Sequence, residues 1–247
     1  MVNLLQQEQD CVNLITKNKE LKTKYKMVHI FTICYNEQIV LPEMIKWYRT
    51  RFPTCKITVY DNFSTDDTEK ITLEAGCEVI KYDSGNEIRD DLYLEIKNNC
   101  WKNSERNWVL ICDTDEWLGI TKEDLIREES LGTTIIRFQG WNMITMSDDP
   151  NIIDFDLHWA SQADQYNKRY LYNRLYINEI GYSAGCHNAS PQGIIQYSER
   201  IYPAYHFKAL GLNYMINRHK EFGQRLSQIN LANSWGVHYV DSEQVIR

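Results

Sequence analysis

Runs of β-forming residues alternate with amphipathic stretches from residue 28 onward. The segment "VHIFTICY" (28–35) is a continuous apolar run, typical of a strand buried on both faces of a sheet. Residues 40–52 instead place apolar side chains at helical spacing, and Pro42 suits a first helical turn, where its missing N–H costs little. Further strands are expected at 56–61, 77–83 and 108–112, and further helices at 64–76 and 88–102. This order predicts a mostly parallel sheet with helices on both faces.

The alternation weakens after residue 120. Strands are expected at 133–144 and 168–173, a strand with a loop in 179–193, a last strand at 202–210 and a helix over 212–230. We find no repeats and no second domain, so the sequence predicts one α/β domain over residues 28–247. Residues 1–26 are polar with sparse apolar positions, and we interpret them as an N-terminal extension to which we assign no chemistry.

Composition narrows the classes of function. The net charge of -7 over 247 residues disfavours a nucleic-acid binder, which usually carries a basic surface. The 7 cysteines form no CxxC pair, so zinc clusters and redox motifs are unsupported and a reducing compartment is indicated. No apolar run approaches the roughly 20 residues of a transmembrane helix, and the N-terminus lacks the features of a signal peptide. We therefore expect a cytoplasmic protein.

Three acids follow the predicted strand at 108–112. Asp113 and Asp115 lie two positions apart, so both side chains can meet one object, and Glu116 follows directly. Carboxylates that converge without a cation repel one another, whereas Mg²⁺ and Mn²⁺ favour carboxylate oxygens. The other interpretation is a solvated strand end at which an Asp caps the next helix. Ligands of doubly wound sheets do gather at the carboxyl ends of strands, which fits the metal interpretation.

Four segments occur in order at strand ends or helix starts: "TICYNE", "VYDNFSTDDT", "RDDLYLEI" and "CDTDEWL". Together they resemble glycosyltransferases of the GT-A fold, near family 2, whose members carry a YNE segment, then a DDGSTD-type segment, then DxD. Here Asn62 and Phe63 replace the usual Asp and Gly. The resemblance covers residues 28–120 well and fades after about 140. It implies a Rossmann-like GT-A domain with a nucleotide-binding half (28–120) and an acceptor half (121–247).

The resemblance also assigns roles to residues of the nucleotide-binding half. Tyr35, Asn36 and Glu37 match the segment that lines the nucleotide pocket, although they could simply end a strand. Asp61 matches the acid that meets the uracil or the ribose, and its alternative role is capping a turn. Arg89 matches an Arg near the base; alone it would be read as a surface charge.

The remaining assignments concern the diphosphate and the metal. Asp113 matches the acid that contacts ribose or metal, and Asp115 the direct metal ligand on the diphosphate. Late histidines often complete such sites, which makes His187 and His206 candidate metal ligands, with a structural role equally open. Lys208 could meet a phosphate.

The acceptor half gives fewer signals. Asp149, in "SDDPN", is a candidate for the base that deprotonates the acceptor hydroxyl, although such a segment is more often a turn. Trp141, Trp159 and Tyr172 could stack on sugar rings or pack in the core.

The implied function is metal-dependent transfer of a sugar, with inversion, from a nucleotide donor (UDP-linked) to a hydroxyl of a glycan or other acceptor. Mn²⁺ or Mg²⁺ would be the cofactor. A phosphatase of the haloacid-dehalogenase type is one alternative, but Trp117 stands where that group has Thr or Val. A non-catalytic, nucleotide- or carbohydrate-binding relic of the fold is another. No P-loop, GxGxxG or Gly-rich N-terminal phosphate loop is present.

Overall fold

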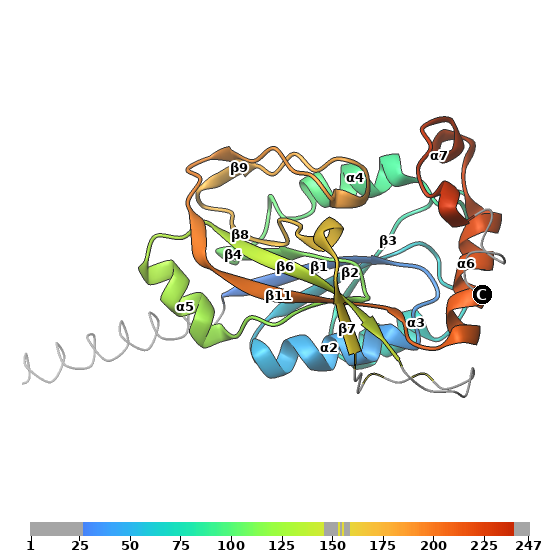
Figure 1. Ribbon diagram of the computed structural model, residues 1–247, viewed down its shortest axis with the longest axis horizontal. Coiled ribbons are helices and arrows are strands. Elements are labelled where there is room, and N and C mark those ends of the chain that lie inside the picture. Colours follow the sequence, from blue (N-terminus) through green and yellow to red (C-terminus); the bar gives the residue numbers. More distant parts are fainter. Residues whose placement is uncertain (1–26, 146–152, 154, 156–158, 240–247) are drawn as a thin grey trace, which may run out of the picture.

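The computed structural model describes residues 27–145, 153, 155 and 159–239 (Figure 1). Its strands are β1 (Val28–Cys34), β2 (Lys56–Asp61), β3 (Glu78–Lys81), β4 (Trp108–Ile111), β5 (Glu116–Leu118), β6 (Ile135–Ile144), β7 (Trp159–Gln162), β8 (Leu171–Asn173), β9 (Ile177–Glu179), β10 (Gln192–Gly193) and β11 (Tyr197–Ala209). Its helices are α2 (Val40–Arg51), α3 (Thr68–Glu74), α4 (Asp90–Asn99), α5 (Lys122–Ser130), α6 (Leu212–Arg225) and α7 (Gln228–Ala232), with short 3₁₀ turns η1 (Asp164–Tyr166), η2 (Ala184–Cys186) and η3 (Val237–Tyr239).

One nine-stranded sheet organises the described residues, in the order β3-β2-β1-β4-β8-β6-β11-β5 with β7 beside β6. The first four strands are parallel, as the sequence predicts. β8 joins them antiparallel to β4, and β6 and β11 then form a second parallel pair. The predicted α/β class with a mostly parallel sheet in a single domain is confirmed, with antiparallel pairs confined to the second half of the sheet.

The central strands are apolar on both faces because helices cover both. Along β4, Trp108 and Leu110 pack with the buried face of α2, whereas Val109 and Ile111 pack with Trp101, which follows α4. This split follows from the strand geometry, in which successive side chains point to opposite faces. Figure 1 shows α2 and α4 on opposite sides of the sheet. Leu110 is fully buried, so its truncation to Ala would cost about 2–5 kcal/mol.

Two predicted helices differ from the structure. The helix predicted at 64–76 begins only at Thr68, because Ser64 and Asp66 use their side chains to bind the loop after β1. The helix predicted over 212–230 breaks at Leu226, whose backbone is extended. The break lets the chain pair with Ile88, since Ile88 N–H donates to the Arg225 carbonyl at 2.6 Å. The loop before α4 is thereby tied to the C-terminal helices.

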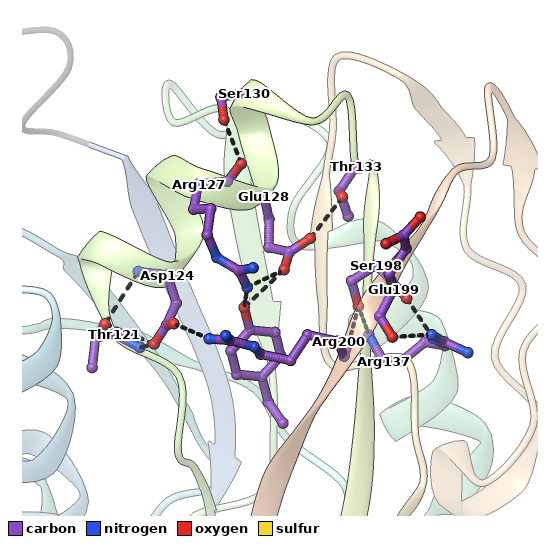
Figure 2. Close-up of polar contacts among 11 residues, drawn as sticks. Thr121, Asp124, Arg127, Glu128, Ser130, Thr133, Arg137, Ser198, Glu199 and Arg200 are labelled. Atoms are coloured by element: carbon purple, nitrogen blue, oxygen red, sulfur yellow. Dashed lines mark hydrogen bonds and ion pairs between the residues drawn. The ribbon is translucent and has the colours of Figure 1, made fainter.

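Helix α5 lies at the end of the sheet away from α6 (Figure 1) and is fixed by polar contacts (Figure 2). Thr121 and Asp124 form a capping box at its start, which supplies partners for helix N–H groups that otherwise have none. Near its end, the Glu128 carboxylate accepts hydrogen bonds from Thr133 at 2.8 Å and Tyr202 at 2.8 Å. Tyr202 belongs to β11, so this network anchors the helix to the sheet and serves the scaffold.

Candidate functional site

A cavity of about 470 Å³ opens at the carboxyl ends of β1 and β4, where ligands of such sheets bind. Its lining includes the turn after β4 and residues of α4, η2, β11, α6 and η3. The predicted site residues that line it are Tyr35, Glu37, Asp113, Asp115, His187, His206 and Lys208. Asn36, Asp61 and Arg89 are not part of the lining, and Asp149 lies outside the described residues.

The turn that carries the acids is held by hydrogen bonds on three sides. Within it, Glu116 N–H donates to the Asp113 carbonyl at 3.1 Å, and Asp113 N–H donates to the Glu116 carboxylate at 2.9 Å. From α2, the buried Tyr48 hydroxyl donates to the Glu116 carbonyl at 2.8 Å. From β11, Phe207 N–H donates to the Asp115 carbonyl at 2.8 Å. This last bond brings the neighbouring His206 to the turn.

Asp115 and His206 face each other in the cavity. The Asp115 Oδ2 atom lies 3.4 Å from His206 Nε2. The other ring nitrogen of His206 donates to Asn142 Oδ1 at 2.9 Å, and the ring stacks on Tyr166 with centroids 3.9 Å apart. Burial would raise the pKa of Asp115, but His206 outweighs it through its charge and hydrogen bond, so the pKa is lowered. The imidazole is thus oriented by two neighbours and turns Nε2 toward a carboxylate.

Asp113, in contrast, is paired with two buried lysines that the sequence interpretation missed. Lys97 Nζ lies 2.5 Å from Asp113 Oδ1, and Lys168 Nζ lies 3.7 Å from Asp113 Oδ2. Lys168 also contacts Glu116 Oε1 at 2.5 Å. Two lysines therefore face two carboxylates, and their charges cancel. Asp115, the third acid of this turn, forms no ion pair with either lysine, so its charge can be met by another cation.

The pKa shifts within this network follow from burial and pairing. Burial alone would raise the pKa of Asp113, but Lys97 and then Lys168 lower it. Burial would lower the pKa of Lys97, yet the Asp113 charge raises it well above the ordinary value. Lys97 lies on the face of α4 that also carries Leu94, three positions earlier. A lysine on the inward face of a helix could have been noticed in the sequence as a buried charge in need of a partner.

Glu37 and Arg218 join the first-strand loop to α6. Arg218 Nη2 forms an ion pair with Glu37, and its Nη1 lies 3.5 Å from the Tyr35 carbonyl and 3.3 Å from the Glu221 carboxylate. Burial raises the pKa of Glu37 to about 7, although Arg218 opposes the rise. Asp115 adds to the rise because both carboxylates are in the same cavity. Nothing in the sequence pattern singled out Arg218, which lies 181 positions from its partner.

Asn36 and Asp61 are engaged in hydrogen bonds between loops. The Asn36 side-chain oxygen accepts from Thr65 N–H at 2.8 Å, and Asn36 N–H donates to Ser64 Oγ at 2.9 Å. Asp61 is fully buried, accepts from Ser64 N–H at 3.0 Å and forms an ion pair with Lys81. In this state both residues shape the loops next to the cavity. Their predicted contacts with a nucleotide stay predictions.

Arg89 and His187 also have protein partners. Arg89 donates twice to the Asp91 carboxylate, at 2.8 and 2.7 Å, at the start of α4. His187 is exposed, and its Nδ1 donates to the Gln165 carbonyl at 2.6 Å. Its ring contacts Tyr166, the residue on which His206 stacks. The structure thus brings His206 to Asp115 directly and places His187 beyond the shared aromatic ring.

The side chains present fit a divalent cation through two ligands. Among the described residues, no group of three His, Cys, Asp or Glu side chains is arranged to hold a metal ion. Mg²⁺ sites, however, often use one or two carboxylates together with substrate phosphates and water. Ligand atoms about 2.1 Å from one ion, at right angles, lie about 3.0 Å apart. The 3.4 Å between Asp115 and His206 is close to that spacing.

The three aromatic residues considered for sugar stacking have different surroundings. Tyr172 is fully buried and packs edge-on against Trp101 with centroids 5.2 Å apart, which is core packing. Trp159 on β7 is 61% exposed. Trp141 on β6 is half-buried. None of the three lines the cavity.

No protein-family model matches the chain. A segment of 58 residues is 41% identical to part of Protein RfbJ of Shigella flexneri. The matched segment covers 22% of this chain and 45% of Protein RfbJ. Within the described residues, no helix is long and apolar enough to cross a membrane.

Among solved structures, the chain is similar to S. aureus TarS 1-349 in complex with UDP, with 14% sequence identity and a TM-score of 0.49. The match covers 88% of this chain and 73% of that chain. A longer TarS chain is covered to 44%. Glucosyl-3-phosphoglycerate synthase from Mycobacterium tuberculosis, with Mn²⁺, UDP and glucosyl-3-phosphoglycerate, gives 11% identity, 66% and 62% coverage, and a TM-score of 0.39. Because the sequence identities are 14% and 11% and the TM-scores 0.49 and 0.39, the activities of these proteins are not assigned to this chain.

Proposed function

We propose that this chain transfers a sugar from a nucleotide donor, UDP-linked, to a hydroxyl group of an acceptor, with the help of a divalent cation. The observation that carries the proposal is the pairing of Asp115 with His206 Nε2 at 3.4 Å, at the carboxyl end of a central strand and inside a cavity. The neighbouring acids are already neutralised by lysines, so this pair is the place in the turn where a further cation is favoured.

Asp115 and His206 would hold the cation, Mn²⁺ or Mg²⁺. When bound, such a cation stabilises the negative charge that a diphosphate leaving group develops. The chain's own part is orientation: Asn142 and Tyr166 fix the His206 ring, and the turn after β4 fixes Asp115. A metal-binding histidine commonly donates its other ring N–H to a neighbouring acceptor, and this hydrogen bond fixes the orientation of the ring.

The nucleoside would lie at the other end of the cavity, beside Tyr35. The Arg225 guanidinium lies 3.3 Å from the centroid of the Tyr35 ring, and its Nη2 is buried without a hydrogen-bond partner among the described residues. Its Nε donates to the Asn86 carbonyl at 3.1 Å, which fixes the plane of the guanidinium. A planar cation with a spare donor suits a flat base that carries carbonyl oxygens.

An inverting transfer also needs a base that deprotonates the acceptor hydroxyl. Asp149 stays our proposed base for an inverting transfer, and it lies outside the described residues. The cavity supplies one further carboxyl group suited to proton transfer, Glu37, because its pKa of about 7 matches the working range of a general base. Its ion pair with Arg218 would have to open for that role.

Donor hydrolysis and nucleotide binding test the proposal. The wild-type protein should bind UDP in the presence of Mn²⁺ in isothermal titration, and should hydrolyse a UDP-sugar from a donor screen. Asp115→Ala and His206→Ala should lose both, whereas Asp67→Ala, which removes an exposed carboxylate before α3, should keep both. Equal turnover in wild type and Asp115→Ala would refute the role of this pair. Phosphate release from a phosphomonoester, without need of a nucleotide sugar, would favour the phosphatase alternative.

A further inference from the structure

A second group of nitrogen-bearing side chains lines the same cavity on its C-terminal wall. We call Lys208, His219 and His238 the basic cluster; they come from β11, α6 and η3. Tyr239 connects them: its ring centroid lies 5.0 Å from Lys208 Nζ, 5.0 Å from the His219 ring and 4.0 Å from the His238 ring. The rings of His219 and His238 are themselves 6.3 Å apart. Three groups able to carry positive charge therefore converge on one aromatic residue.

The basic cluster has no carboxylate in contact with it among the described residues. No ion pair involves Lys208, His219 or His238 in that part of the chain, whereas Lys97, Lys168 and Arg218 of the same cavity are all paired. Lys208 thus has no counter-charge in contact with it, and an anion beside it would supply one.

His219 adds an independent sign of a missing partner. The residue is buried, at 9% exposure, and neither ring nitrogen has a hydrogen-bond partner among the described residues. A buried polar group without a partner costs about 1–3 kcal/mol, so native proteins seldom keep one without a reason. Burial, followed by the charges of Lys208 and His238, lowers the pKa of His219 to about 4. The ring is held neutral in this state, and either nitrogen can still donate to an anion.

We propose that Lys208, His219 and His238 form a binding site for a phosphate group carried by one of the two substrates. This rests on the proposed function, since the substrates of that reaction supply the phosphate. Lys208 and the exposed His238 meet the phosphate oxygens first, and a turn of the Tyr239 ring opens His219 to the same group. Lys208 follows His206 by two residues on β11, and both line the cavity with Asp115, so the site adjoins the proposed metal pair.

The phosphate has two possible sources with the same chemistry. It is either the diphosphate of the nucleotide donor or a phosphate on the acceptor. The first source makes the basic cluster a protein-supplied clamp on the leaving group, beside the cation. The second makes it a specificity element that selects a phosphorylated acceptor over a neutral one. Because both sources place oxyanions against the same three side chains, variants and ligands together have to separate them.

The experiment is isothermal titration of the full chain with UDP, uridine and inorganic phosphate, at pH 7 and with Mn²⁺ present. Lys208→Met and His238→Gln are the test variants, Lys208→Arg is the conservative rescue, and Lys70→Met removes an exposed lysine of α3 as the matched control. His238 is exposed, so its variant keeps the test open should Lys208→Met unfold. Losing one hydrogen bond to the charged phosphate should weaken phosphate binding about 10- to 100-fold.

Each result then decides. Weaker UDP binding with unchanged uridine binding supports the donor diphosphate as the occupant. Weaker binding of inorganic phosphate with unchanged UDP binding supports the acceptor phosphate. Equal affinities of wild type, Lys208→Met and His238→Gln for both UDP and phosphate would overturn the site. A wild-type protein that binds phosphate through these residues but shows no Mn²⁺-dependent UDP binding would keep the site and refute the proposed function instead.

Discussion

Replacing Lys168 by Met tests the neutral network beneath the proposed metal pair. Lys168 is buried, with its side chain 5% exposed, and contacts the Glu116 carboxylate, which is 3% exposed, at 2.5 Å. Methionine keeps most of the volume and removes the charge. Among the described residues, the buried Glu116 carboxylate then keeps the Tyr170 hydroxyl, at 3.3 Å, and the Asp113 N–H as hydrogen-bond partners. Removing one partner of a buried ion pair typically costs about 3–5 kcal/mol.

Lys168→Met should therefore lower the free energy of unfolding by about 3–5 kcal/mol at pH 7. Asp113 loses its more distant partner in the same variant, at 3.7 Å, but keeps its contact with Lys97 at 2.5 Å. The unpaired Glu116 carboxylate is therefore the main source of the expected cost.

Urea denaturation at pH 7 measures this change in the free energy of unfolding. Lys70→Met is the control for the loss of a positive charge and should change the free energy of unfolding by less than about 0.5 kcal/mol. The double variant Lys168→Met, Glu116→Gln removes both charges and should recover much of the loss at pH 7. A cost for Lys168→Met below about 1 kcal/mol at pH 7 would refute the account of a tightly paired buried network.

Two further predictions concern neighbours of this network. Because the pKa of Glu37 is raised to about 7, the folded chain binds more protons than the unfolded chain between about pH 4.3 and 7. The contribution of Glu37 to the free energy of unfolding is therefore lost as the pH rises through that window, by up to about 1.4 kcal/mol per pH unit. Glu37→Gln should flatten that slope in urea denaturation, and an unchanged slope would contradict the shift. Tyr48→Phe should cost about 1–3 kcal/mol, because the Tyr48 hydroxyl donates to the Glu116 carbonyl and accepts from Leu118 N–H. A thermal denaturation curve identical to that of wild type would rule out this role of the hydroxyl.

Sequence patterns were enough to predict the first half of the fold. The apolar runs of β1, β2 and β4 are local signals, since a strand covered by helices on both faces must be apolar throughout. The break at Leu226 gave no such signal, because it depends on pairing with Ile88, far away in the chain. Likewise, β5 is a short strand whose existence depends on its partner β11.

The candidate site divides in the same way. The acids Asp113 and Asp115 were predicted from their place after an apolar strand, and the cavity indeed contains both. Their difference in surroundings could not be predicted, because it comes from Lys97 and Lys168, which the fold brings from two other segments. The local sequence pattern thus indicates which residues lie at the end of a strand. Tertiary packing decides which of their carboxylates are paired with a lysine.

Electron paramagnetic resonance of Mn²⁺ bound with UDP tests the central claim most directly. The account predicts a nitrogen coupling from the His206 imidazole and phosphorus couplings from the diphosphate in the same complex. In His206→Ala the nitrogen coupling should vanish, and in Asp115→Ala the ion should bind too weakly to give the complex. Phosphorus couplings without any nitrogen coupling in the wild-type protein, or a signal that His206→Ala and Asp115→Ala leave unchanged, would contradict the claim that this pair holds the cation.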